Sequence, residues 1–264
     1  MEQIEKNNIK EIKKLNQRGG RMLSLIDLLE DNTLNMEMAS FLLFSMLNNS
    51  SFLTAANPSG TGKTTLMGAL LNLLKPGIEI KTVEQASHLD SNKYDLNENL
   101  RFLIHEIGNG PYYSYIWGKA VNNFFGLTKK ARVTSCIHAD TLKELKEIVF
   151  NPPLLVEKDY FYNLDLILFM TMEGDFYSRK RRVSSVYGCT ENNFIKLYEW
   201  NQESDNFNKC NLDTYLDFIS NNNRLSKIES EIQNCHDFIE KLKRQDINTI
   251  LEVRKEILNN FTTY

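Results

Sequence analysis

This sequence of 264 residues has little of what marks several classes of protein. Its four cysteines are widely spaced, with no C-x-x-C pair, which argues against a disulfide framework or a zinc site and favours reduced, intracellular thiols. No apolar run approaches the roughly 18 residues of a membrane span; the longest candidate, LDLILFMTM from Leu164, has the length of a strand. Residues 1–20 mix acids and bases without an apolar stretch, which is not the pattern of a secretory signal.

A general positive charge is also missing. The formal net charge is -3, which does not favour nucleic acid as a partner. Two short basic clusters stand out, SRKRR (Ser178 to Arg182) and TKKAR (Thr128 to Arg132). They lie either in solvated turns or against a neighbouring subunit's phosphate, an acidic partner or a membrane headgroup.

What the sequence does contain is an alternation of strand and helix patterns. Strands are predicted at 52–56, 78–85, 100–107, 132–140, 163–173 and 181–189, and helices at 65–74, 113–126 and 141–150. This order predicts an α/β fold with a largely parallel central sheet.

The two ends of the chain have helical patterns. A charged helix is predicted within residues 1–20, and a second helix begins after a cap at Asn35 or Thr33. From about Asn211 apolar residues recur at helical spacing, which fits a helical cap packed on the core better than a free coiled coil; these residues are Leu225, Ile228, Ile232, Cys235, Ile239 and Leu242. We therefore expect three parts: a helical lead-in (1–50), a core (51–200) and a small C-terminal helical subdomain (201–264).

The strongest motif is ANPSGTGKTT, residues 56–65. It matches the phosphate-binding pattern G-x-x-x-x-G-K-[ST] except that Asn57 replaces the first glycine. Asparagine is a tolerable substitute there, because it adopts positive φ more readily than most residues. A strand before the loop and a helix after it supply the required context. Backbone amides would hold phosphates, Lys63 would reach the β- and γ-phosphates, and Thr64 would bind Mg²⁺. The predicted nucleotide-binding residues are Asn57, Ser59, Gly60, Thr61, Gly62, Lys63, Thr64 and Thr65.

Hydrolysis would also need a carboxylate near the metal and a group that orients water. Glu106 and Glu84 each end a predicted strand, where they would lie at the carboxyl edge of the sheet beside the loop. Each is otherwise a solvated strand-end glutamate. His138, near the end of a third strand, is either a sensor of the γ-phosphate or a core histidine.

The order of these motifs resembles the RecA-like P-loop motor domain of type II/type IV secretion ATPases, and within them the archaeal branch for archaella and type IV pili. NPSGTGKTT is similar to its Walker A, TVEQ to its acidic box, FLIHEI to its Walker B and TSCIHADTLKEL to its histidine box. Similar flanking segments extend the likeness to residues 18–264. By this resemblance Glu84, Glu106 and His138 are the catalytic residues, and Thr64 and Glu106 hold the Mg²⁺ of bound ATP.

The sequence departs from the family pattern at several positions. Gln85 replaces the acidic-box aspartate, His105 the Walker B glycine, and Gly108 an arginine that the family often has. The arginine that the family has after its histidine box is not evident in TLKELKEIVF, and residues 1–50 are too short for the N-terminal domain that most members carry. A missing arginine lowers phosphoryl-transfer rates by about 10³–10⁵-fold, so the pattern indicates nucleotide binding more firmly than fast hydrolysis.

The resemblance implies a cytoplasmic motor ATPase, peripheral at the inner face of the membrane, that forms a homo-oligomeric ring, in the family manner a hexamer. Its partner would be a membrane platform protein of a pilus or secretion machine. The alternative is a hydrolysis-impaired regulatory or scaffold subunit of such a machine. A third reading, a DNA-translocating relative, is disfavoured by the acidic net charge.

Overall fold

A computed structural model describes residues 2–16, 19–90, 93–175, 178–223 and 227–261, excepting the side chains of 222 and 223. The predicted cluster residue Leu225 lies outside these ranges. The α-helices are α1 (Gln3–Lys14), α2 (Leu25–Glu30), α3 (Met36–Leu47), α4 (Lys63–Leu71), α5 (Ala120–Gly126), α6 (Leu142–Phe150), α7 (Lys158–Phe161), α8 (Leu212–Asn223), α9 (Ile228–Arg244) and α10 (Ile250–Asn260). The strands are β1 (Phe52–Ala55), β2 (Glu79–Thr82), β3 (Leu100–Ile107), β4 (Tyr115–Ile116), β5 (Arg132–Ile137), β6 (Leu166–Glu173), β7 (Lys180–Thr190), β8 (Asn193–Asn201) and β9 (Asn206–Lys209).

One mixed sheet runs through the described part of the chain in the order β2-β3-β5-β1-β6-β7-β8-β9, with β4 beside β3. The pairs from β2 to β6 are parallel, and β6 to β9 are antiparallel. The predicted α/β class with a largely parallel central sheet is confirmed. Because β3, β5 and β1 are neighbours and run in the same direction, the residues that follow them meet at one edge of the sheet.

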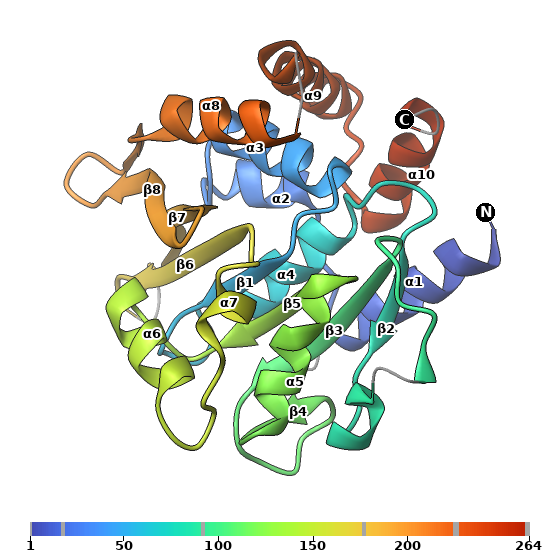
Figure 1. Cartoon of the computed structure of the whole chain (residues 1–264). Coiled ribbons are helices and arrows are strands. Elements are labelled where there is room, and N and C mark those ends of the chain that lie inside the picture. Colours follow the sequence, from blue (N-terminus) through green and yellow to red (C-terminus); the bar gives the residue numbers. More distant parts are fainter. Residues whose placement is uncertain (1, 17–18, 91–92, 176–177, 224–226, 262–264) are drawn as a thin grey trace.

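Helices cover both faces of the sheet (Figure 1). Along β6, Leu166 and Leu168 belong to one apolar cluster and Ile167 and Phe169 to the other, as the alternation of side chains along a strand requires. The first cluster contains residues of α1–α4 and α8–α10, and the second those of α5–α7. The core therefore lies in two apolar layers, one on each side of the sheet.

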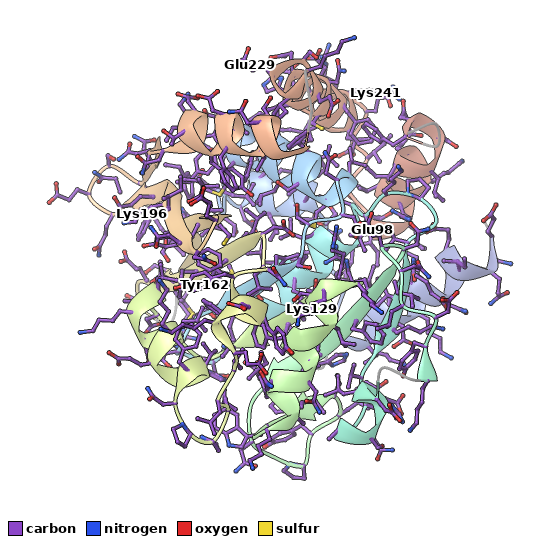
Figure 2. The ribbon with its side chains drawn as sticks, in the orientation of Figure 1. Glu98, Lys129, Tyr162, Lys196, Glu229 and Lys241 are labelled. Carbon is purple, nitrogen blue, oxygen red and sulfur yellow. The ribbon has the colours of Figure 1, made fainter. Side chains whose placement is uncertain are left out.

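The N- and C-terminal helices share the first of these layers. Helix α9 packs against α3, and Arg254 of α10 forms a buried ion pair with Glu5 of α1, its Nε lying 2.7 Å from Oε2. Lys241 of α9, labelled in Figure 2, pairs with Glu256 of α10 at 2.9 Å. The last helices thus pack directly on the lead-in helices. The division at residues 50 and 200 stays a prediction.

Several local predictions differ from the structure. The segment 113–126, expected to be helical, begins with strand β4 and becomes helical only from Ala120. Ser114 (φ 57°) and Gly118 (φ 73°) have left-handed backbone conformations, which interrupt a helix. Strands β8 and β9 were not predicted, and β9 continues the sheet beyond residue 200. The cap of α3 is Asn35, whose Oδ1 accepts a hydrogen bond from the backbone N–H of Met38.

Candidate functional site

The site is built around the turn between β1 and α4. Gly60 (φ 88°) and Gly62 (φ 101°) both have left-handed backbone conformations that favour glycine, and Gly62 directly precedes α4. The free amides of the first turn of α4 and the positive end of its dipole therefore face the loop. This is the arrangement that binds phosphate at a helix N-terminus.

Lys63 begins α4 and is 7% exposed. Its Nζ donates a hydrogen bond to the carbonyl oxygen of Ala56 at 2.8 Å and lies 3.4 Å from Nδ1 of His138. The ammonium group thus lies between the end of β1 and the residue that follows β5. A charged amine held by a neutral carbonyl can exchange that partner for an anionic phosphate, which is a stronger acceptor.

Glu106 and His138 lie close to each other in the same cavity as Lys63. Oε1 of Glu106 lies 4.0 Å from Nε2 of His138. Glu106 is 6% exposed, and its Oε1 is buried with no hydrogen-bond partner. Burial raises the pKa of Glu106, while Lys63 and His138 oppose that rise. A raised pKa suits a carboxylate that takes a proton near neutral pH.

Asn57 has a different role from the one its sequence position suggested. Asn57 is not among the described residues with positive φ. The prediction that asparagine replaces glycine here by adopting positive φ is therefore wrong. Instead, its side-chain amide donates to Oε1 of Glu144 at 2.8 Å, and its backbone N–H donates to Oδ1 of Asp140 at 2.7 Å. Its carbonyl oxygen lies 2.7 Å from Nδ1 of His138. The loop entrance is therefore joined to the turn between β5 and α6.

Glu84 lies apart from these groups. It is exposed two residues after β2 and accepts a hydrogen bond from the hydroxyl of Tyr113 at 2.8 Å. Tyr113 in turn packs edge-on against the ring of His105, with ring centroids 5.1 Å apart. Burial lowers the pKa of His105 to about 4. The structure thus brings Lys63, Glu106 and His138 together and leaves Glu84 outside the residues that line their cavity.

That cavity has a volume of about 690 Å³ and is partly open to solvent. It takes in the loop from Ser59 to Thr65 together with Glu106 and His138. It also takes in residues that sequence reasoning did not assign to the site. Those of the lead-in, such as Arg21 and Met22, gave no signal in the sequence.

The basic run at the start of β7 gave such a signal. Arg179, Lys180, Arg181 and Arg182 all line the cavity. Nε of Arg181 donates to the carbonyl oxygen of Gly60 at 2.9 Å, so this run reaches the chain's own phosphate loop. Arg181 is exposed, as a solvated residue would be, but it lies in strand β7 rather than in a turn.

The donors present suit a metal that arrives with phosphates. Among the described residues, no group of three or more His, Cys, Asp or Glu could enclose a metal ion. Mg²⁺ commonly uses one or two protein oxygens and takes the rest from phosphate and water. The unpaired, buried Oε1 of Glu106, in the cavity that Thr64 also lines, fits that mode.

Over the described ranges, no helix is long and apolar enough to cross a membrane.

No family model matches this chain, and no curated protein matches it. The solved structures that match this chain include two ATPases. The VirB11 ATPase of the Brucella suis type IV secretion system, in complex with sulphate, shares 18% identity over 62% of this chain and 54% of that one, with a TM-score of 0.42. The chain thus spans about half the length of that structure. The Legionella pneumophila ATPase DotB shares 9% identity over 87% of this chain and 67% of that one, with a TM-score of 0.41.

Proposed function

We propose that this chain binds ATP with Mg²⁺ and hydrolyses it, as a motor-type ATPase similar to those of type IV pilus or archaellum assembly and type II/IV secretion. The observation that carries the proposal is the meeting of Lys63, Glu106 and His138 in one cavity at the N-terminus of α4. A phosphate cradle, a cation and a buried carboxylate are the parts that phosphoryl transfer requires.

Each residue has a role in this proposal. The loop amides from Ser59 to Thr65 bind the phosphates, and Lys63 leaves Ala56 to contact their outer oxygens. The Thr64 hydroxyl and Glu106 hold Mg²⁺, which when bound neutralises phosphate charge. Glu106 also accepts a proton from the attacking water, and His138 contacts the terminal phosphate. The role of Glu84 as a second catalytic carboxylate stays part of the proposal through the resemblance alone.

The resemblance of the motifs also supports an assembly. We propose a homo-oligomeric ring, a hexamer in the family manner, in the cytoplasm and peripheral to the inner face of the membrane. Hydrolysis would drive a membrane platform protein of a pilus or secretion machine. In this proposal residues 51–200 form the RecA-like core, between the helical lead-in (1–50) and the C-terminal helical subdomain (201–264).

The test is Mg²⁺-dependent ATP turnover by the purified chain, measured with nucleotide affinity. We expect Lys63→Ala to lose tight binding and Glu106→Gln to keep binding but lose turnover by about 10²-fold or more. Lys143→Ala and Glu147→Gln are matched controls, because these side chains are 88% and 63% exposed on α6. Turnover no faster than that of Lys63→Ala, alone and with a membrane partner, would refute the motor.

A second candidate function is a nucleotide-binding scaffold or regulatory subunit with impaired hydrolysis. The observation that favours it is the position of Glu84, which is exposed and bonded to Tyr113 outside the cavity. Of the two predicted catalytic carboxylates, Glu106 alone lines the cavity. Glu84→Gln separates the two: a motor that needs Glu84 loses turnover with this variant. Fast turnover by the isolated protein would exclude the scaffold.

A further inference from the structure

Of the three basic residues that begin β7, Lys180 and Arg182 are held by an acid within the described ranges and Arg181 is not. Arg182 is 4% exposed, and its Nε donates to Oδ1 of Asp205 at 2.8 Å. Lys180 donates to Oδ2 of the same Asp205 at 3.1 Å. Arg182 also donates to the backbone carbonyl of Asp31. These bonds tie the start of β7 to the β8–β9 turn and to the end of α2, so the strand is fixed beside the cavity.

Arg181 points the other way, as neighbours on a strand do, and lies over the phosphate loop. Its Nε donates to the carbonyl oxygen of Gly60 at 2.9 Å. A Cβ placed on Gly62 would lie 3.4 Å from Cδ of Arg181 and 3.2 Å from Cε of Met170. The side chain therefore crosses directly above the second glycine of the loop, at the start of α4.

The guanidinium group of Arg181 has capacity left for an anion. Among the described residues its only side-chain partner is the Gly60 carbonyl, and no carboxylate lies within ion-pair distance of it. A guanidinium carries five N–H donors in a planar fork that matches two phosphate oxygens. With Nε on Gly60, both Nη groups remain for such a ligand.

Four buried polar atoms of residues that line the same cavity also lack hydrogen-bond partners in the described part of the chain: Oγ1 of Thr61, Oε1 of Glu106 and both ring nitrogens of His105. Thr61 is 1% and Glu106 6% exposed. Buried polar groups are nearly always satisfied, so unsatisfied ones beside an open cavity indicate a ligand with polar atoms. These residues line the cavity that Arg181 also lines, so a ligand that satisfies them would share that cavity with the guanidinium of Arg181.

We propose that Arg181 contacts the terminal phosphate of a nucleoside triphosphate on this loop and stabilises the charge that develops during its transfer. The inference rests on the proposed function. In the step it serves, the oxygen of water bonds to the terminal phosphorus and the bond to the bridging oxygen breaks. That electron pair leaves with the diphosphate, and the proton of water passes to Glu106 and then to solvent. An arginine within the chain thereby takes the role of the family arginines missing after Walker B and the histidine box.

The experiment compares Arg181→Gln and Arg181→Lys with the wild type, with Arg244→Gln as control. Arg244 is a suitable match because its side chain, on α9, is 73% exposed and pairs with Glu240. Two quantities are measured: the ratio of affinities for a non-hydrolysable ATP analogue and for ADP, and the single-turnover rate with Mg-ATP. Thermal melts confirm that each variant is folded.

We expect Arg181→Gln to reduce the preference for the triphosphate analogue by about tenfold or more, the value of a lost charge-assisted hydrogen bond. Its single-turnover rate should fall by about 10³-fold, as for other arginines that contact a transferred phosphoryl group. Arg181→Lys should restore part of the triphosphate preference and little of the rate, because lysine lacks the fork.

Failure of this inference and failure of the proposed function give different results. If Arg181→Gln matches the wild type in both measurements while Lys63→Ala does not bind, the inference is overturned and nucleotide binding stands. If the wild type binds but has no turnover, the motor fails, and the affinity ratio alone decides the role of Arg181. An equal loss of ADP and ATP-analogue affinity in Arg181→Gln would also overturn the inference, since it indicates loop support rather than terminal-phosphate contact.

Discussion

The hydrogen bond between Asn57 and Glu144 gives the sharpest test of how the loop is held. The side-chain amide of Asn57 donates to Oε1 of Glu144 at 2.8 Å, while Oε2 of Glu144 accepts the backbone N–H of Asp140 at 2.7 Å. Asp140 accepts the backbone N–H of Asn57 through Oδ1. Three residues thus form a closed set of bonds between the loop entrance and the start of α6.

The perturbation is a double-mutant cycle of Asn57→Ala and Glu144→Ala. A hydrogen bond to a charged group contributes about 1.5–3 kcal/mol when protected, but exposed charged pairs contribute about 0.2–1 kcal/mol in such cycles. Asn57 is exposed and Glu144 half-buried, so we expect a coupling of about 0.5–1.5 kcal/mol between these limits. The other hydrogen bonds of Glu144 do not enter the coupling energy, because Glu144→Ala removes them equally in the presence and absence of Asn57.

The assay is urea unfolding at low and high salt, together with the affinity of each variant for nucleotide. Asn57→Gly is included, because it restores the common glycine without the amide. We expect it to be about as destabilising as Asn57→Ala or more, since glycine adds about 0.4–1 kcal/mol of unfolded-state entropy. Glu147→Ala, one turn further along α6, is the control. Strictly additive effects of Asn57→Ala and Glu144→Ala, or a more stable Asn57→Gly, would refute the reasoning.

Two further predictions concern stability. Burial raises the folded pKa of Glu106 above the unfolded value of about 4.3. Folding therefore favours the protonated carboxyl, which contributes to the free energy of unfolding. That contribution is full below about pH 4 and is lost as the pH rises through the raised pKa. Glu106→Gln should therefore melt at a higher temperature than wild type near pH 7 and at the same temperature near pH 4; a difference independent of pH would contradict this. Arg254→Met leaves Glu5 buried and unpaired and should lower the free energy of unfolding in urea by about 3–5 kcal/mol. The double variant Glu5→Leu/Arg254→Met should recover most of that lost stability. If it recovers none, the unpaired charge of Glu5 is not the cause of the loss.

Much of the fold could be predicted because its signals are local. The boundaries of β3 were predicted correctly from eight apolar-rich residues, all of them buried. The loop between β1 and α4 was identified by its glycines, and both adopt the positive φ that the motif needs. The strand after Tyr113 was missed because its partner, β3, lies earlier in the chain, and pairing with that strand overrides a weak helical pattern.

The candidate site was less predictable, because its parts come from distant segments. Asn57 could be identified as unusual from the loop pattern, but its partners lie 83 and 87 residues further along the chain. Arg181 reaches Gly60 across 121 residues, and only its charge marked it in the sequence. Pairings of this kind depend on the order of strands in the sheet, which the periodicity of one segment does not encode.

The same strand order explains why two similar strand-end carboxylates differ. Glu106 is the penultimate residue of β3, which lies two positions from β1 in the sheet, whereas Glu84 follows β2, which lies three positions away. With about 4.8 Å between neighbouring strands, Glu84 begins roughly 5 Å further from the loop than Glu106. Its side chain is also held by Tyr113. In the proposed reaction, the loop therefore relies on Glu106 rather than Glu84 to accept the proton of water, and on Arg181, which crosses above Gly62, to stabilise the charge on the phosphate.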